Sequence, residues 1–297
     1  MNPPPGRVGL HRSLTPYVWV MPAVVLYFVF KLAPLIGGVY LALLRWDGIE
    51  PATFVGLDNF VQIFHDKLIA SALMNNIKFA IGTVVGKTVL SLLLALLLNQ
   101  GIRGRGFYRT ALFTPVVISM VVVGLLWSWI YNPQFGLLND LLRLVGMENL
   151  ILDWLGGTKV ALWSLMVVEI WKWYGFHMVI FLAGLQTIPE ELYEVARIDG
   201  ASRLRRLASI TLPLLQPTML INVTLALMGA LNVFDIPYVM TAGGPANSTM
   251  VMALHIYIRG FRYGKFGYGT AMSYALLLFV TVVAGIQMRL MWRPDNQ

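Results

Sequence analysis

Cysteine is absent from this 297-residue chain, and charged side chains are scarce. Without cysteine, the protein has no disulfide, no thiolate metal site and no thiol nucleophile. Only 12% of the residues are charged, whereas soluble domains contain about 25%. Hydrophobic residues make up 58% of the chain and the mean hydropathy is +0.70. These values predict an integral membrane protein.

The sequence also lacks the residue patterns that are typical of metal sites, acid–base catalytic sites and nucleotide-binding sites. The histidines are scattered along the chain as His11, His65, His177 and His255, which argues against a membrane enzyme and predicts no metal site. The order GTVVGKT from Gly82 to Thr88 has one residue too few for a phosphate-binding loop, and it lies inside an apolar run with no preceding strand. We interpret it as small residues that let two helices approach closely. If ATP drives this protein, a partner must hydrolyse it, and no cofactor is expected on this chain.

Long apolar runs are what the sequence does contain. Because about 20 apolar residues cross a bilayer as a helix, we expect an all-α protein with six spans near residues 17–43, 73–98, 110–131, 160–185, 214–239 and 268–291. The first run is too long for a signal-peptide core and is expected to remain as an uncleaved span. We divide the chain into an N-terminal segment with the first span and an external loop (1–70), a transmembrane domain of five helices (71–291) and a tail (292–297).

Basic residues indicate the orientation. More of them flank the spans on the side of the two termini than on the opposite side, so the positive-inside rule places both termini in the cytoplasm. Arg259, Arg262 and Lys265 lie on the external side and oppose this assignment locally. The net charge of +8 is spread over these flanks and does not form a stripe. It therefore reflects topology, and no nucleic acid partner is expected.

The inner loop, residues 186–213, separates the fourth and fifth spans and has the most specific pattern. Pro189 is suited to start a short helix, acidic residues at its beginning complement the helix dipole, and Gly200 permits the left-handed turn that ends it. Residues 201–210 can form a second helix, and Pro213 is expected to break the pattern before the fifth span. Two helices joined in this way would form a rigid knob that fits the groove of a soluble partner.

A basic loop attracted to anionic lipid is the alternative for this segment. It explains Arg203, Arg205 and Arg206, but not the glutamates, which anionic lipid would repel. The spacing also speaks for the knob. Glu194-Val195-Ala196 is followed by Asp199-Gly200 and, after nine further residues, by Ile210-Thr211-Leu212-Pro213.

This spacing resembles the loop of binding-protein-dependent ABC importer permeases, in which a smaller alanine usually stands at the position of Val195. Most of the chain from about Asn59 onward resembles the carbohydrate-uptake type, in particular the first permease subunit of maltose and glycerol-3-phosphate systems. The stretches that carry the resemblance are FVGLDNF (54–60), WSWIYNPQFGLLN (127–139), FLAGLQTIPEELYEVARIDGA (181–201) and VFDIPYVMTAGGPANST (233–249).

The resemblance implies a type I ABC importer permease fold in the cell membrane, surrounded by lipid. It implies a second homologous permease subunit, two cytoplasmic ATPase subunits that hold ATP and Mg²⁺, and an extracytoplasmic solute-binding protein that delivers a mono- or oligosaccharide or a polyol phosphate. The chain itself would be no enzyme. A secondary transporter or channel for a small polar solute is the alternative, although no convincing internal repeat supports it. The residues implied in ATPase coupling are Glu190, Glu191, Glu194, Ala196, Asp199, Gly200, Ala201, Ile210, Leu212 and Pro213.

Polar residues inside spans cost about 2.5 to 3.5 kcal/mol each and need a partner or a function. Glu169 and Lys172 are three residues apart, so they share a helix face and can neutralise one another, or Glu169 can serve a transport path. Lys87 is expected near a helix end or a partner subunit. His177 is expected to be a satisfied hydrogen-bonding residue or part of the path.

Sugar recognition combines aromatic platforms with amides and carboxylates that bond hydroxyls. Asn232 and Asp235 are three apart and are expected on one helix face, with Phe234 between them. Hydrogen bonding between helices is the alternative role for each polar residue. The residues we predict for a substrate path are Glu169, Trp173, His177, Asn232, Asp235 and Tyr238.

Overall fold

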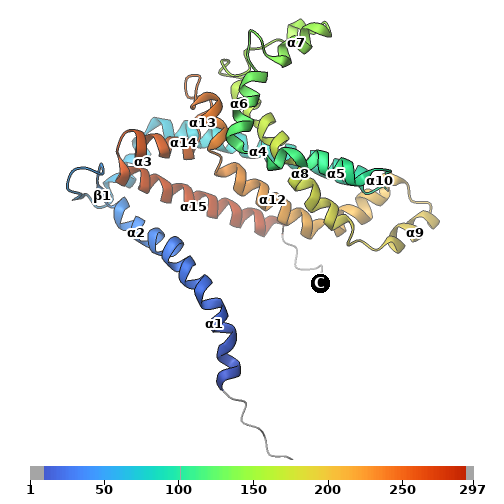
Figure 1. The fold of residues 1–297 in the computed structure, drawn as a ribbon, viewed down its shortest axis with the longest axis horizontal. Coiled ribbons are helices and arrows are strands. Elements are labelled where there is room, and N and C mark those ends of the chain that lie inside the picture. Colours follow the sequence, from blue (N-terminus) through green and yellow to red (C-terminus); the bar gives the residue numbers. More distant parts are fainter. Residues whose placement is uncertain (1–9, 101, 292–297) are drawn as a thin grey trace, which may run out of the picture.

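The computed structural model describes residues 10–100 and 102–291, which form an almost entirely helical protein (Figure 1). Within these residues, four segments are long and apolar enough to cross a membrane alone. They are Tyr17–Ala42 within α1 (Leu10–Tyr27), a π-helical turn (Phe28–Leu32) and α2 (Ala33–Ala42), and the helices α4 (Lys67–Leu98), α8 (Ala161–Leu185) and α15 (Phe266–Met291). Two bent helix pairs bring the number to six if each pair is one span. The predicted all-α fold is confirmed.

The third expected span, near residues 110–131, is not one helix. It consists of α5 (Arg105–Val117) and α6 (Met120–Ile130), which meet at an angle of 96°. Ile118 and Ser119 between them have extended backbone. Pro115 lies in the last turn of α5 and has no N–H to donate, which weakens the helix just before the break. In Figure 1, α5 follows the bundle and α6 rises away from it toward α7 (Leu137–Leu144).

The fifth expected span is also shorter and more broken than predicted. Its helix, α12 (Gln216–Leu231), stops at Asn232, and the chain becomes helical again as α13 (Asp235–Thr241). Before it, α10 (Arg203–Arg206), a π-helical turn (Leu207–Thr211) and α11 (Leu212–Leu214) form a continuous stretch that meets α12 at 70°.

Pro213 lies near the end of this stretch, and the helical run breaks two residues later, before α12, as predicted. In the π-helical turn, the Leu212 N–H bonds to the carbonyl oxygen of Leu207, five residues earlier. This turn is wider than an α-helical turn, so the proline ring is not forced against the carbonyl four residues before it. The bend itself falls at Leu215, between α11 and α12, where the side chain is fully buried.

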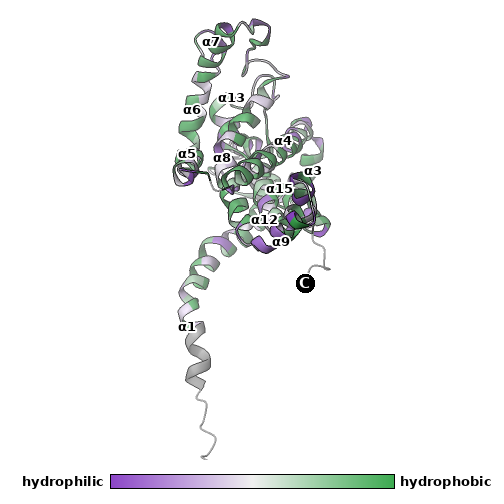
Figure 2. Cartoon of the chain, turned by 90° about the vertical axis from the view of Figure 1, so that its right-hand side faces the viewer, coloured by the Kyte–Doolittle hydropathy of each residue, from purple (hydrophilic) through white to green (hydrophobic). Residues whose placement is uncertain are grey.

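The core of the bundle lies where α4 packs against α8. A Cβ added at Gly82 would lie 2.6 Å from the Met166 sulfur, and one at Gly86 would collide with Ile170. The predicted role of these small residues in close helix approach is therefore confirmed. Figure 2 shows hydrophobic colour over most of the helical bundle and hydrophilic colour at α3 (Asp58–His65) and at α9 (Glu190–Ile198).

The shorter elements gather beyond the ends of the long helices. A hairpin of β1 (Leu44–Arg45) and β2 (Thr53–Phe54) pairs Leu44 with Phe54, and it lies near α3 and α14 (Met252–Tyr257) at one end of the bundle (Figure 1). A 3-10 turn (Glu148–Leu150) follows α7, and a π-helical turn (Ile258–Arg262) follows α14. The inner loop, with α9 and α10, lies at the opposite end. The predicted tail, 292–297, lies outside the described residues.

Candidate functional site

The first helix of the inner loop is bounded as the sequence predicts. Pro189 precedes α9, and Glu190 and Glu191 stand in its first turn, where negative charge complements the helix dipole. Gly200 adopts a φ of +75°, the conformation that a non-glycine residue adopts only at a cost. The Ala201 N–H bonds to the Ala196 carbonyl at 2.9 Å, and the Gly200 N–H bonds to that of Arg197 at 3.0 Å. This pair of bonds is a Schellman motif, which closes the helix.

The second part of the inner loop is tied to the first. Ser202 accepts a bond from the Arg205 N–H and so caps α10, and the Tyr193 hydroxyl shares a 2.9 Å hydrogen bond with that of Thr211. Leu212 is half-buried and Pro213 exposed in the helical stretch that continues to α12. A small cavity of about 190 Å³ between the two parts is lined by Ala196, Asp199, Ala201, Arg205, Arg206, Ser209 and Ile210.

Apolar side chains face outward from this loop. Val195 and Ile198 on α9 are exposed, Ile198 to 86%, and Leu204 on α10 to 78%. Glu194 is exposed beside them. The larger side chain of Val195 therefore does not disturb packing inside the loop. It would instead contact a partner that covers this surface. We call the exposed residues Leu192, Val195, Ile198 and Leu204 the knob face.

A larger cavity, of about 370 Å³, opens to one side of the bundle between α4, α8, α12 and the start of α6. We call it the central cavity. Five of the six predicted path residues line it. The sixth, Tyr238, does not, and its ring stacks on that of Phe234 with the ring centroids 5.2 Å apart. The complete lining is Lys87, Met120, Glu169, Trp173, Phe176, His177, Leu225, Gly229, Asn232, Val233, Phe234 and Asp235.

Glu169 pairs with Lys87, so the expected pairing with Lys172 is wrong. The Lys87 ammonium lies 3.2 Å from Glu169 Oε1, and both side chains are at most 3% exposed. Lys87 is therefore neither at a helix end nor free for a partner subunit. A buried charge needs a compensating partner, and the close packing of α4 on α8 supplies one that the spacing along α8 does not reveal. Among the described residues, the second oxygen, Glu169 Oε2, has no hydrogen-bond partner.

Lys172 instead caps the broken end of α5. Its ammonium donates to the carbonyl oxygens of Pro115 at 2.9 Å and Val116 at 2.6 Å. The last carbonyl groups of a helix accept no hydrogen bond from the helix itself. The break at Ile118 therefore leaves the carbonyl groups at the end of α5 free to accept from Lys172. Gly175 permits the close approach, because a Cβ there would collide with the backbone of α5.

His177 is satisfied within the bundle, as one of the two predictions for it states. Its Nδ1 donates to Asn222 Oδ1, and Asn222 Nδ2 donates back to the His177 carbonyl at 2.9 Å. These bonds join α8 to α12. The same ring also lines the central cavity, and a role of His177 in a substrate path stays a prediction.

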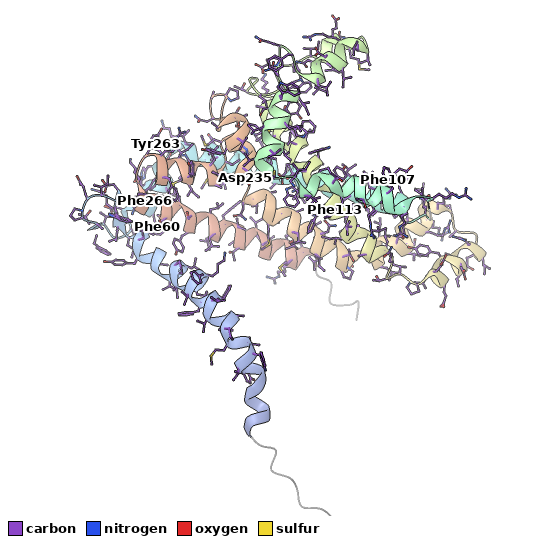
Figure 3. The ribbon with its side chains drawn as sticks, viewed as in Figure 1. Phe60, Phe107, Phe113, Asp235, Tyr263 and Phe266 are labelled. Carbon is purple, nitrogen blue, oxygen red and sulfur yellow. The ribbon has the colours of Figure 1, made fainter. Side chains whose placement is uncertain are left out.

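Asn232 and Asp235 both line the cavity, but not from one helix face. Asn232 ends α12, where its Nδ2 donates to the Met228 carbonyl at 2.8 Å, and Asp235 begins α13. The break between the helices, and not helical spacing, brings the two side chains to the cavity. Figure 3 shows Asp235 near the middle of the protein, beside the junction of α5 and α6.

Comparison with known proteins decides what kind of protein carries these two features. Residues 87–292 match the family described as "Binding-protein-dependent transport system inner membrane component". The chain belongs to this family. It is a transport component and a multi-pass membrane protein.

Similar proteins cover nearly the whole permease. It is 36% identical over 281 residues to the probable ABC transporter permease protein YurN of Bacillus subtilis, which covers 94% of this chain and 96% of that one. It is 34% identical over 269 residues to the trehalose/maltose transport system permease protein MalF of Thermococcus litoralis, covering 90% of each. A solved bacterial ABC transporter for import of the acidic polysaccharide alginate has the same fold, with a TM-score of 0.84, 24% identity, and coverage of 97% of this chain and 98% of that one.

The permease also contains a polar cluster that the sequence analysis missed. Asp66, which caps α4, accepts bonds from the Leu68 N–H at 3.0 Å, His255 Nε2 at 3.1 Å, Arg259 Nη2 at 3.0 Å and the Tyr268 hydroxyl at 3.1 Å. We call these side chains the Asp66 cluster. Its members are up to 202 residues apart. The one signal in the sequence is Arg259, a basic residue on the side where the positive-inside rule disfavours it.

The Asp66 cluster shifts the protonation of two of its groups. Burial raises the pKa of Asp66, but the Leu68 N–H, His255 and Arg259 together outweigh it, so that the pKa lies below its ordinary value of 3.8. Burial lowers the pKa of His255 below its ordinary value of 6.5, although the Asp66 carboxylate opposes that shift. The resulting state is a neutral imidazole that donates to an ionised carboxylate.

Proposed function

We propose that this permease is one half of the translocation path of an ATP-driven importer for a carbohydrate. Its partners are a second homologous permease, two cytoplasmic ATPase subunits that hold ATP and Mg²⁺, and an extracytoplasmic solute-binding protein. The observation that carries the proposal is the exposed inner loop at one end of a bundle that has an open polar and aromatic cavity on one side. The relatives named for trehalose, maltose and lactose transport support carbohydrate as the substrate class.

The knob face is the surface that we assign to the ATPase. Exposed apolar side chains that are framed by polar ones mark protein contacts, and the glutamates of α9 disfavour burial in anionic headgroups. On this assignment the inner loop is cytoplasmic. Both termini then lie in the cytoplasm as well, if each bent helix pair crosses the membrane once.

Motion of the knob has a direct route to the central cavity. The Tyr193–Thr211 hydrogen bond links α9 to the stretch that passes through buried Leu215 into α12. The far end of α12 carries Asn232, which lines the cavity. When ATP draws the ATPase subunits together, a shift of the loop would tilt α12 and move one wall of the cavity. This is how a chain without a catalytic site would take part in ATP-driven transport.

The central cavity suits part of a sugar. Trp173, Phe176 and Phe234 offer ring faces for the apolar side of a pyranose, and Asn232 and Asp235 offer groups that bond hydroxyls. Its volume is at the low end of the roughly 300 to 1,000 Å³ that is typical of ligand sites. The second permease would supply the facing wall.

Reconstitution tests this proposal. The permease is purified with its co-encoded partners, placed in proteoliposomes with ATP and Mg²⁺ inside, and given the solute-binding protein and radiolabelled saccharides outside. We expect sugar uptake that requires both ATP and the binding protein. Failure of any ATPase subunit to co-purify, or uptake that is independent of ATP and driven by an ion gradient, would contradict it.

A further inference from the structure

The central cavity contains more negative than positive charge. Its charged lining residues are one lysine, Lys87, and two carboxylates, Glu169 and Asp235. The Lys87 ammonium is already paired with Glu169 Oε1 at 3.2 Å. Lys172 does not neutralise the remaining negative charge of the cavity. Its ammonium donates to the Pro115 and Val116 carbonyls, and the residue does not line the cavity.

One oxygen of Glu169 and both oxygens of Asp235 have no hydrogen-bond donor among the described residues. Glu169 Oε2 is buried and, among the described residues, has no hydrogen-bond partner, while the whole side chain is only 3% exposed. An unsatisfied buried acceptor is rare in proteins and costly. Within residues 10–100 and 102–291, the Asp235 carboxylate likewise has no hydrogen bond or ion pair, and it stands at an exposed position of the lining. Asp235 is therefore an acceptor that donors from outside the chain can reach, while the buried Glu169 carboxylate adds negative charge to the wall of the cavity.

The other polar groups do not change this balance. The Asn232 amide nitrogen is engaged with the Met228 carbonyl. His177 Nδ1 is engaged with Asn222 Oδ1. Both of these nitrogens therefore already have a partner within the chain. A solute that bears hydroxyl or ammonium donors would satisfy the Asp235 carboxylate, and bonds to a charged acceptor are shorter and stronger than neutral ones.

We propose that this cavity selects uncharged or cationic hydroxylated solutes, namely neutral saccharides and amino sugars, and rejects uronates and sugar or polyol phosphates. This inference rests on the proposed function and narrows its substrate class. An anionic solute would bring a third negative charge next to two carboxylates and one lysine that is already paired, and like charges repel. It would also offer Asp235 fewer donors.

The first test measures substrate charge in the reconstituted importer. Mono- and disaccharides are each offered as the neutral sugar, the amino sugar, the uronic acid and the sugar phosphate. We expect the neutral or amino form of the transported sugar to enter at least tenfold faster than its acidic forms. Equal or faster uptake of a uronate or phosphate would overturn the inference and leave the proposed function intact. Absence of ATP-dependent uptake for every sugar would contradict the proposed function itself.

The second test separates this cavity from the binding protein, which is kept the same. Asp235→Asn removes one negative charge and breaks no ion pair or hydrogen bond, because the Asp235 side chain has no partner among the described residues. We expect uptake of the amino sugar relative to the neutral sugar to fall about tenfold, and relative uptake of the acidic form to rise by a similar factor. Asp58→Asn is the matched control and should leave both ratios unchanged, because Asp58 is likewise an exposed aspartate in the first turn of a helix, α3, with no side-chain partner among the described residues.

Glu169→Gln provides a second variant with the same expected direction. If it fails to assemble because Lys87 loses its partner, Asp235→Asn still decides the question. Ratios that stay at the wild-type value in Asp235→Asn, whatever the change in total uptake, would show that cavity charge does not select the substrate.

Discussion

The Lys172 ammonium donates to the Val116 carbonyl oxygen at 2.6 Å, across the point where α5 breaks and α6 turns away. Lys172 belongs to α8, so one side chain of an unbroken helix holds the free end of a broken one. The 96° bend therefore depends on more than Pro115.

Loss of this cap should favour a straighter α5–α6 segment. In Lys172→Met, the Pro115 and Val116 carbonyls lose their donor at a cost of about 1 to 3 kcal/mol. Because the chain contains no cysteine, spin labels at Phe107→Cys and Trp129→Cys, both at exposed positions, report one distance without background labelling. We expect a longer distance in Lys172→Met and the original one in Lys172→Arg. An unchanged distribution in Lys172→Met would contradict a role for Lys172 in the bend.

The buried Lys87–Glu169 pair predicts strong coupling between two substitutions. Lys87→Met alone leaves an unpaired buried carboxylate and should lower stability by about 3 to 5 kcal/mol. Lys87→Met with Glu169→Gln removes both charges and should recover more than half of that loss. Thermal unfolding of the detergent-solubilised permease measures the stability of the double variant and of each single variant. A double variant that is as unstable as the sum of the single variants would show that the two residues do not interact.

The Asp66 cluster predicts a loss of stability on acidification. The folded pKa of His255 lies below 6.5, so the unfolded chain takes up a proton first as the pH falls. Stability contributed by neutral His255 is complete above about pH 6.5 and is lost between there and the lower folded pKa. The lowered pKa of Asp66 acts in the same direction, but only below about pH 4.

His255→Gln isolates this effect, because glutamine retains a donor for Asp66 and does not titrate. We expect its unfolding temperature to change less than that of the wild type between pH 7 and pH 5. His65→Gln, on the exposed face of α3, serves as the control and should follow the wild type. A His255→Gln profile that coincides with the wild type would exclude His255 as the titrating group.

Gly200 and Gly146 offer a matched pair for the inner loop. Both have positive φ and open space around them, and each closes a short helix with the same two backbone bonds. Proline cannot adopt positive φ, so Gly200→Pro should abolish transport and ATPase association, while Gly146→Pro in α7 should retain ATPase association. Co-purification and uptake are the measurements. Normal transport by Gly200→Pro would remove the loop from coupling.

The sequence predicted features that depend on local chemistry. The apolar lengths of α8 and α15 predicted spans, Gly82 and Gly86 predicted close helix packing, and Gly200 predicted a helix end. What it did not predict depends on tertiary structure. The pairing of Lys87 with Glu169 follows from which helices are neighbours, and proximity of Glu169 and Lys172 in sequence concealed it.

The helix breaks also depend on tertiary structure that the sequence did not reveal. Pro115 and Pro213 are similar in sequence, since each is a proline in a helical run. One precedes a break that Lys172 caps, and the other is accommodated by a π-helical turn. Asn232 and Asp235 were predicted to share one helix face, but a break in the helix, which their spacing did not indicate, brings both to the cavity.

Cross-linking tests the central claim, that the knob face binds a cytoplasmic ATPase, most directly. Ile198→Cys on α9 and Leu144→Cys on α7 each introduce one exposed cysteine into a chain that has none. We predict that Ile198→Cys cross-links to the ATPase subunit and is protected in intact cells from a membrane-impermeant maleimide, whereas Leu144→Cys is labelled and forms no ATPase cross-link. Labelling of Ile198→Cys from outside, with no cross-link to the ATPase, would contradict the account.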